Sequence, residues 1–508
     1  MIDLLPQDKK QLADRGMSES DVREQCRCLN EVDHAVRVLR PAISGDGILT
    51  LSESAMQRLQ TAYDRLSQGK RLMKFVPASG AASRMFKKWF QWLEEMPQEG
   101  VETLSKTLHD YPFYQMLDEM MREQGISLNA LEAAKDYRSI LQFLLTPEGL
   151  RLGSLPKGLL PFHRTPDGVR TAFEEHWVEA AAYAACSDGC VHLHFTVSPE
   201  HENGFRRLAQ ALKLRYGRQM GLRYELEFSH QMPQTDTVSL DSEGNLFRDP
   251  EGGLVFRPGG HGSLIHNLNH LDADVVFIKN IDNVTTDALR ADTVVFKKCL
   301  AAMLLECQAE CFAVLRRLDD GTDTDALEAA EGLMRDTLHL PFPSDYAAFD
   351  TARRREYCRI RLDRPIRVCG MVPREKDPGG GPFWVQGADG LPTLQIVETS
   401  ELDLGDPGQR RCLDDSRFFN PVDLVCGLKD YRGRPFDLTR YVDRNRYFTA
   451  EKSQAGRSLR VLEHPGLWNG AMSDWITIFV AVPITTFTPV KTVEDLLRPA
   501  HLSTSNTR

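Results

Sequence analysis

The chain has 508 residues, of which 42% are hydrophobic and 26% charged, ordinary values for a soluble globular protein. Lys and Arg number 62 against 72 Asp and Glu, which gives a net charge of −10, and no long basic block offsets it. This balance argues against a general nucleic-acid surface. The length is sufficient for a large core and exceeds that of one small domain.

We expect neither a targeting segment nor a membrane segment in this sequence. Its first residues, MIDLLPQDKKQLADRG, lack the positive-then-apolar order of a signal peptide. The most apolar helix-like stretch, 299–305, meets Glu306 long before a membrane span is complete. The 11 cysteines are odd in number and scattered, which favours reduced thiols. We therefore expect a cytoplasmic protein without a membrane partner; the sequence does not define an oligomeric state.

The N-terminal part of the chain is predicted to be helical. Apolar residues recur at three- and four-residue steps from Leu51 to Leu66. A strand follows at 72–76, and a second helical block begins near residue 86. We therefore expect a helical segment 1–70 and, after the first strand, a helical insertion 86–150.

Strands and helices alternate along the middle of the chain. Strand-like runs occupy 191–197, 224–228 and 274–279, with helical stretches between them. The last run lacks apolar–polar alternation, as expected for a strand that is covered on both faces. This interleaving predicts an α/β fold with a Rossmann-like, mostly parallel mixed sheet flanked by helices.

The sequence becomes rich in strands after a helical block at 291–338. The strand-like runs there are 366–372, 394–397 and 475–480. Clusters of glycine and proline separate these runs. We predict a core over 71–360, which includes the insertion, and a strand-rich C-terminal part over 361–508.

The first strand ends in small residues and an arginine, PASGAASRMFK at 77–87. Small residues after a strand most often just permit a tight turn into a helix. In the functional interpretation, Ala78, Ser79 and Gly80 let backbone N–H groups approach a nucleotide, and Arg84 faces phosphate. The loop is not a P-loop, because the GK[ST] ending is absent. Taken alone, the loop leaves both interpretations open.

Two later residues are suited to bind metal or phosphate. Asp282 follows the strand 274–279, and parallel sheets bind ligands at the carboxyl ends of their strands. Its carboxylate could hold Mg²⁺ against phosphate oxygens, or cap the turn. Lys491 lies between a strand-like run and a helix, and by itself is typical of the surface.

Histidines and cysteines do not form a recognisable metal motif. His192 and His194 share one face of a strand, and Cys186 and Cys190 lie just upstream. None has the CxxC…CxxC or HExxH spacing of a firm zinc site. We expect these histidines to be structural.

In chain order, several short motifs resemble those of the UDP-sugar pyrophosphorylases, which include UDP-glucose and UDP-N-acetylglucosamine pyrophosphorylases. Residues 79–85 resemble the family's glycine-rich opening loop, without its double glycine and Gly-Thr pair. Leu155-Pro156-Lys157-Gly158 resembles its proline-lysine-glycine segment. In the family the two segments nearly touch, whereas residues 86–154 separate them here.

The later motifs keep the family's order. Residues 194–198 resemble the family's second strand, and residues 228–233 resemble its glutamine-containing turn. Residues 258–262 resemble its PxGxG segment, and residues 280–283 resemble its aspartate-asparagine pair. Towards the C-terminus, residues 395–402 resemble its VEYSEL segment, residues 419–420 its FN pair and residues 489–492 its PVKT segment. Thr399 stands where the family has tyrosine. The chain also resembles an uncharacterised bacterial family, domain of unknown function 4301, whose name supplies no activity.

The resemblance implies a Mg²⁺-dependent nucleotidyltransferase that joins a nucleoside triphosphate to a sugar 1-phosphate, or a similar phosphate, and releases pyrophosphate. Such transfer depends on alignment and on charge neutralisation at the phosphates. The implied residues are Arg84, Lys157 and Lys491 as cations, Asp282 for Mg²⁺, Ala78, Ser79, Gly80, Gln231, Gly259 and Gly260 for the nucleotide, and Glu398 and Asn420 for the sugar. The alternative is a catalytically inactive nucleotide-sugar-binding or regulatory protein on the same fold.

Overall fold

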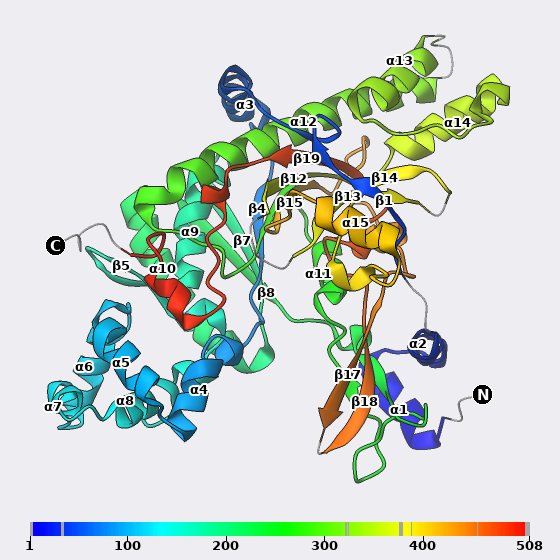
Figure 1. Cartoon of the computed structure of the whole chain (residues 1–508). Helices are drawn as coiled ribbons and strands as arrows, with labels where there is room; N and C mark the ends of the chain where they lie inside the picture. Colours follow the sequence, from blue (N-terminus) through cyan, green and yellow to red (C-terminus); the bar gives the residue numbers. More distant parts are fainter. Residues whose placement is uncertain are drawn as a thin grey trace. The chain divides into compact units, whose positions relative to one another are not determined.

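The computed structural model describes residues 4–31, 35–320, 323, 325–374, 379–387, 389–454 and 456–502 (Figure 1). The chain forms two compact units, each assembled from separate stretches. Unit 1 comprises Met1–Arg71, His230–Ile278 and Lys298–Val482, and unit 2 comprises Leu72–Ser229, Lys279–Lys297 and Pro483–Arg508. These units divide the chain differently from the boundaries expected at residues 70 and 360, because strands far apart in sequence pair with one another.

Unit 2 contains three parallel strands with helices between them. They are β4 (Leu72–Pro77), β7 (Cys190–Thr196) and β8 (Arg223–Ser229), and the helices are α9 (Ala172–Tyr183) and α10 (Pro199–Met220). The ring of Phe173 in α9 lies 4.5 Å from that of Phe195 in β7 and 5.2 Å from that of Phe205 in α10. Both helices therefore pack on the same face of these strands.

The helical insertion is also part of unit 2, and its helical character is confirmed. Its helices are α4 (Lys87–Glu94), α5 (Gln98–Thr107), α6 (Tyr114–Glu123), α7 (Leu128–Ala133) and α8 (Tyr137–Leu145). A short hairpin, β5 (Pro161–Thr165) and β6 (Gly168–Thr171), follows them. The buried ring of Trp89 packs against Tyr111 at 5.2 Å and Phe113 at 6.0 Å, which gives the insertion a small aromatic core of its own.

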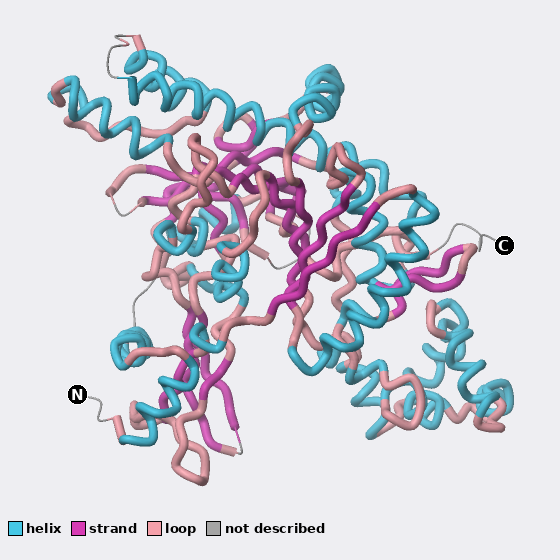
Figure 2. The backbone as a smooth tube through the Cα atoms, turned by 180° about the vertical axis from the view of Figure 1, so that it is seen from behind, coloured by secondary structure: helices cyan, strands magenta, loops and turns pink. Residues whose placement is uncertain are grey.

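Unit 1 contains a second run of mainly parallel strands. In order of pairing they are β2 (Ile43–Ser44), β3 (Gly47–Leu49), β19 (Ile476–Ala481) and β12 (Ile366–Pro373), followed by the antiparallel β16 (Asp423–Gly427) and then β11 (Val275–Lys279). β15 (Phe418–Phe419) pairs with the end of β12. The predicted fold class, α/β with a mostly parallel mixed sheet flanked by helices, is confirmed (Figure 2).

Two smaller antiparallel sheets complete the strands of unit 1. One pairs β1 (Val38–Pro41), β13 (Gly381–Gln386) and β14 (Pro392–Val397), and the other β10 (Phe256–Arg257), β9 (Thr237–Asp241), β18 (Arg457–Glu463) and β17 (Phe448–Gln454). The remaining helices are α1 (Pro6–Arg15), α2 (Glu19–Asn30), α3 (Glu53–Leu66), α11 (Leu264–Asn269), α12 (Arg290–Asp320), α13 (Ala326–Gly332), α14 (Thr351–Leu362) and α15 (Pro407–Asp415).

The segment 1–70 is only partly helical, contrary to the prediction. Three short strands, β1, β2 and β3, interrupt it between α2 and α3. β1 pairs with β13, and β3 pairs with β19, both from the C-terminal part of the chain. Local periodicity does not reveal such strands, because their partners lie hundreds of residues away. None of the described helices is long and apolar enough to cross a membrane.

Candidate functional site

The loop after β4 lies open at its centre. Ser79, Gly80 and Arg84 are exposed, whereas Ala78 is buried and its N–H donates to the carbonyl oxygen of Thr196 at 2.8 Å. Gly80 does not adopt a positive φ, and a Cβ added there would meet no described atom within 4 Å. The turn itself therefore does not require glycine at this position. Open space beside the main chain is what the functional interpretation of the loop expects.

The segment around Lys157 returns to this loop. The backbone N–H of Lys157 donates to the carbonyl oxygen of Gly80 at 3.1 Å, and the backbone N–H of Ala82 donates to the carbonyl oxygen of Leu155 at 3.2 Å. Ala81 and Pro156 form an antiparallel bridge. The two ends of the helical insertion therefore lie next to each other. The loop 79–85 and the segment 155–158 are side by side despite their separation in sequence.

Gly158 allows this close approach. A Cβ at that position would lie 2.8 Å from the ring of Phe205 and 3.2 Å from Ile281. Glycine thus lets the segment pack tightly between α10 and the turn after β11. Because Asp282 follows Ile281, the same packing brings the side chain of Lys157 to that carboxylate.

Two lysines bind one oxygen of Asp282. The ammonium of Lys157 lies 2.9 Å from Asp282 Oδ2, and that of Lys491 lies 3.0 Å from the same atom. Lys157 also donates to the carbonyl oxygen of Val490 at 2.8 Å. The side chain of Lys157 is 14% exposed and that of Lys491 56% exposed, so this cluster has a buried side and an open side.

The turn that contains Lys491 is fixed to the same place by its main chain. Pro489 forms an antiparallel bridge with Asn283, and the N–H of Val490 donates to the carbonyl oxygen of Asp282 at 3.1 Å. The carboxylate of Asp495 accepts the N–H groups of Lys491 at 2.8 Å and Thr492 at 2.7 Å. Lys491 is therefore not the isolated surface residue that its local sequence indicates.

Electrostatics keep Asp282 ionised. Burial alone would raise its pKa, but the charges of Lys491 and Lys157 outweigh burial and hold the pKa below its usual range. One carboxylate between two ammonium groups leaves the cluster with one net positive charge. Asp282 Oδ1 is buried and has no hydrogen-bond partner among the described residues.

That free oxygen decides whether Mg²⁺ fits. Mg²⁺ is usually bound by one or two carboxylates together with water and substrate phosphate oxygens. Asp282 provides one carboxylate oxygen that the protein leaves unused. The residues present therefore fit a Mg²⁺ ion that is held jointly with a phosphate-bearing substrate.

The other predicted site residues belong to unit 1. A Cβ at Gly259 would lie 2.4 Å from the ring of His464 and 2.5 Å from the carbonyl oxygen of Thr235, and Gly260 has a φ of +76°. Close packing against 463–465 is therefore sufficient to explain these two glycines. Gln231 is half-buried, and its Nε2 has no partner among the described residues.

Unit 1 uses the side chains of both Glu398 and Asn420. The amide of Asn420 donates to the carbonyl oxygen of Gly370 at 3.1 Å and accepts the N–H of Val422 at 3.0 Å, so both of its ends are engaged. Burial raises the pKa of Glu398, whose carboxylate accepts side-chain hydrogen bonds from Asn469 and Trp468 and faces His261 with 3.9 Å between Oε1 and Nε2.

Comparison with known proteins defines the family. Residues 5–502 match the family described as Domain of unknown function (DUF4301). The chain belongs to this family. No curated protein matches it.

Among solved structures, this DUF4301 protein is similar to three pyrophosphorylase-type enzymes. The uridine diphosphate N-acetylglucosamine pyrophosphorylase from Trypanosoma brucei is 13% identical, with 97% of this chain and 81% of that chain covered and a TM-score of 0.48. UDP-glucose phosphorylase from Trypanosoma brucei is 12% identical (96% and 77% covered, TM-score 0.46), and UDP-glucose pyrophosphorylase from Leishmania major is 13% identical (97% and 79% covered, TM-score 0.42). Similarity this low does not bear on activity.

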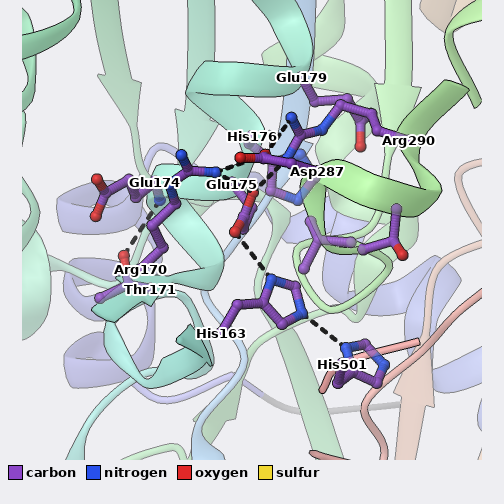
Figure 3. A network of polar contacts seen from close by, with 12 residues as sticks. His163, Arg170, Thr171, Glu174, Glu175, His176, Glu179, Asp287, Arg290 and His501 are labelled. Atoms are coloured by element: carbon purple, nitrogen blue, oxygen red, sulfur yellow. Dashed lines mark hydrogen bonds and ion pairs between the residues drawn. The ribbon is translucent and has the colours of Figure 1, made fainter. Parts of the chain in front are cut away.

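A buried network in the DUF4301 protein was not predicted from its sequence (Figure 3). His163 Nδ1 lies 2.9 Å from Glu175 Oε1, and His163 Nε2 lies 2.8 Å from Nδ1 of His501. Arg290 donates to the other oxygen of Glu175 at 2.7 Å. Burial and the neighbouring His163 lower the pKa of His501 to about 3, so this imidazole is neutral. The network fastens the segment that contains Lys491 to α9 and β5.

The histidines of β7 also have partners that sequence spacing does not reveal. His192 Nδ1 lies 3.2 Å from Glu225 Oε2 on β8, and these two residues and Cys190 place their ligand atoms within 4.8 Å of one another. The guanidinium of Arg223 lies beside the same carboxylate, with 3.5 Å between Nε and Oε1. Because Arg223 already neutralises the carboxylate of Glu225, we assign this cluster of the DUF4301 protein a structural role.

Proposed function

We propose that the chain is a nucleotidyltransferase that joins a nucleoside triphosphate to a sugar 1-phosphate, or a similar phosphate, and releases pyrophosphate. The observation that supports this most is the position of Lys157, which contacts both Gly80 and Asp282. Four motif segments, 78–84, 155–158, 280–283 and 489–492, thereby form one cluster in unit 2. Each of them resembles a segment of the UDP-sugar pyrophosphorylases.

The cluster suits a reaction that needs charge neutralisation more than covalent catalysis. A phosphate oxygen of the acceptor attacks the α-phosphorus, the bond from that phosphorus to the bridging oxygen of pyrophosphate breaks, and pyrophosphate leaves. Lys157, Lys491 and Arg84 would neutralise the charge that spreads over the phosphate oxygens. Asp282 Oδ1 would hold Mg²⁺, which supplies Lewis-acid stabilisation of the same oxygens.

The second candidate is a nucleotide-sugar-binding protein without turnover. The loop lacks the double glycine and the Gly-Thr pair of the family that it resembles. Arg84 is exposed and makes no hydrogen bond or ion pair with a described residue, so the fold does not fix its direction. A loop of this kind binds anions without necessarily aligning them for in-line transfer.

One experiment distinguishes the two candidates. Pyrophosphate release is measured for each common nucleoside triphosphate with a panel of sugar 1-phosphates, in the presence of Mg²⁺. A transferase releases pyrophosphate with at least one pair, and Lys157→Ala abolishes the signal. Binding of nucleotide sugars in calorimetry without release by any pair would favour the second candidate. If neither release nor binding occurs, both are wrong.

The metal has its own test. Asp282→Asn should remove the Mg²⁺ dependence of nucleotide binding, because the amide is a poor replacement for a Mg²⁺-binding carboxylate. Binding of pyrophosphate without metal should not weaken, since the two ammonium groups lose a competing anion. Unchanged Mg²⁺ dependence in the variant would exclude Asp282 as the metal ligand.

A further inference from the structure

Unit 1 contains a cavity of about 950 Å³ that the proposed transfer does not use. The described residues of its wall come from the segment 31–37 just before β1, from β13 and β14, from the end of α14, and from the loops 440–446 and 473–474. None of the residues assigned above to nucleotide, sugar or metal lines it. Its volume is within the range of pockets that bind small molecules, about 300–1,000 Å³.

Among the described residues that line the cavity, all the cationic ones are arginines. They are Arg37, Arg361, Arg364, Arg440, Arg444 and Arg446, and the acidic lining residues are Glu31, Asp389, Asp443 and Asp474. Arg446 pairs with Glu401, and Glu31 pairs with Arg27, and both of these partners lie outside the lining. The other described lining residues, five arginines and three aspartates, still give this surface a positive charge, although the whole chain has a net charge of −10. Such a local reversal of sign attracts anions to the cavity.

Only part of this charge is neutralised by the protein. Arg361 pairs with Asp389 at 3.2 Å, and Arg364 pairs with Asp474. By contrast, three exposed arginines at the cavity, Arg37, Arg440 and Arg444, make no side-chain hydrogen bond or ion pair with any described residue. The unpaired positive charge therefore comes from the segment just before β1 and from the loop 440–446.

One buried arginine leaves a donor unused. The side chain of Arg361 is 7% exposed, and its Nε is buried with no hydrogen-bond partner among the described residues. An unsatisfied buried donor on a charged group destabilises the protein unless an acceptor reaches it. Arg361 also lines the cavity, so the unused donor belongs to a side chain that a ligand there would contact.

The chemistry of these groups indicates the ligand. A guanidinium presents its donors as a planar fork that matches two oxygens of a phosphate, whereas an ammonium acts as a point charge. Lysine is absent from the described residues that line the cavity, in contrast to the lysine-based cluster of unit 2. We propose that this cavity binds a phosphorylated small molecule at a site separate from nucleotidyl transfer.

The test uses the full chain with the other anion-binding cluster disabled. In a Lys157→Ala/Lys491→Ala background, inorganic tripolyphosphate is titrated by calorimetry at fixed ionic strength. We expect saturable binding at one site. Adding Arg440→Gln and Arg444→Gln should weaken it at least tenfold, and Arg361→Lys, which keeps the charge and loses the fork, should also weaken it.

A matched control separates a site from general charge. Arg207→Gln with Arg218→Gln removes the same charge from the exposed surface of α10, and should leave the affinity unchanged. Thermal unfolding of every variant checks that it is folded; Arg440, Arg444, Arg207 and Arg218 are exposed and unpaired among the described residues, so their replacement should leave the melting temperature nearly unchanged. Absence of saturable binding in the background variant, or an equal loss in the α10 control, would overturn the proposal.

Discussion

Unit 2 contains two clusters with the same charges, in which one carboxylate lies between two lysines. Asp282 lies between Lys157 and Lys491, and Glu179 on α9 lies between Lys74 and Lys279. The first is the proposed phosphate site. The second is part of the packing between α9 and the strands.

The Glu179 cluster is closed and satisfied. The side chains of Lys74, Glu179 and Lys279 are at most 2% exposed. Lys74 and Lys279 each bind a different oxygen of Glu179 at 2.9 Å, and Tyr183 donates to one of them at 2.7 Å. Burial lowers the pKa of Lys74 to about 7. Neither oxygen of this carboxylate is available to a ligand.

The Asp282 cluster differs in what the protein leaves unused. Both lysines bind the same oxygen, the second oxygen has no partner among the described residues, and Lys491 is more than half exposed. Charge composition therefore does not distinguish a binding site from a structural ion cluster. The two clusters are distinguished by the unused oxygen of Asp282 and by the solvent exposure of Lys491.

The largest expected effect concerns stability. Glu179→Gln removes the carboxylate that compensates the buried charge of Lys74 and Lys279, and should lower the free energy of unfolding by about 3–5 kcal/mol, as for other broken buried pairs. Asp282→Asn should cost less than half as much, because Lys491 can turn toward solvent. Urea denaturation of both variants measures the difference. Equal losses would mean that Asp282 is as structural as Glu179.

The next effect concerns turnover. Lys157→Ala should lower the rate of transfer by roughly a hundredfold or more, the scale for loss of one preorganised electrostatic group. The dissociation constant for nucleotide should change less, since Arg84 and Lys491 remain. Steady-state kinetics and calorimetry separate the two quantities, with Lys213→Ala on α10 as the control. An unchanged rate would remove Lys157 from the site.

The smallest expected effect compares two glycines. Gly80→Ala adds a methyl group to open space, so stability should stay within about 0.5 kcal/mol while nucleotide binding weakens severalfold. Gly158→Ala places a methyl group 2.8 Å from Phe205 and should cost about 1–3 kcal/mol of stability. Thermal unfolding and nucleotide titration of both variants provide the readouts. Normal nucleotide binding by Gly80→Ala would show that no ligand occupies that space.

Local patterns were sufficient to predict the strands that became β4, β7, β8 and β11, each within one or two residues. Each combines an apolar run with flanking helical periodicity, and both signals lie within a short stretch of sequence. The strands β1 and β3 were missed because their stability comes from β13 and β19, far along the chain. Short strands with distant partners have no local signature.

The site was predictable in its parts but not in its assembly. Asp282 was identifiable from its place after a buried strand, whereas Lys491 alone had the features of a surface lysine. Lys491 reaches the carboxylate of Asp282 only because its neighbour Pro489 forms a bridge with Asn283, in the turn after β11. The arginine cavity was not predicted, because its residues come from distant stretches of chain that share no motif.

The insertion between Gly80 and Lys157 is closed by main-chain hydrogen bonds at its base, and this makes its length free to vary. Adding or deleting residues within 87–150 changes the size of a loop whose ends are already held together. Each doubling of such a loop costs only about 0.6 kcal/mol of closure entropy. Another segment could therefore replace the insertion without shifting Lys157 relative to Gly80. The insertion is accordingly a suitable position at which to attach a reporter or a binding module.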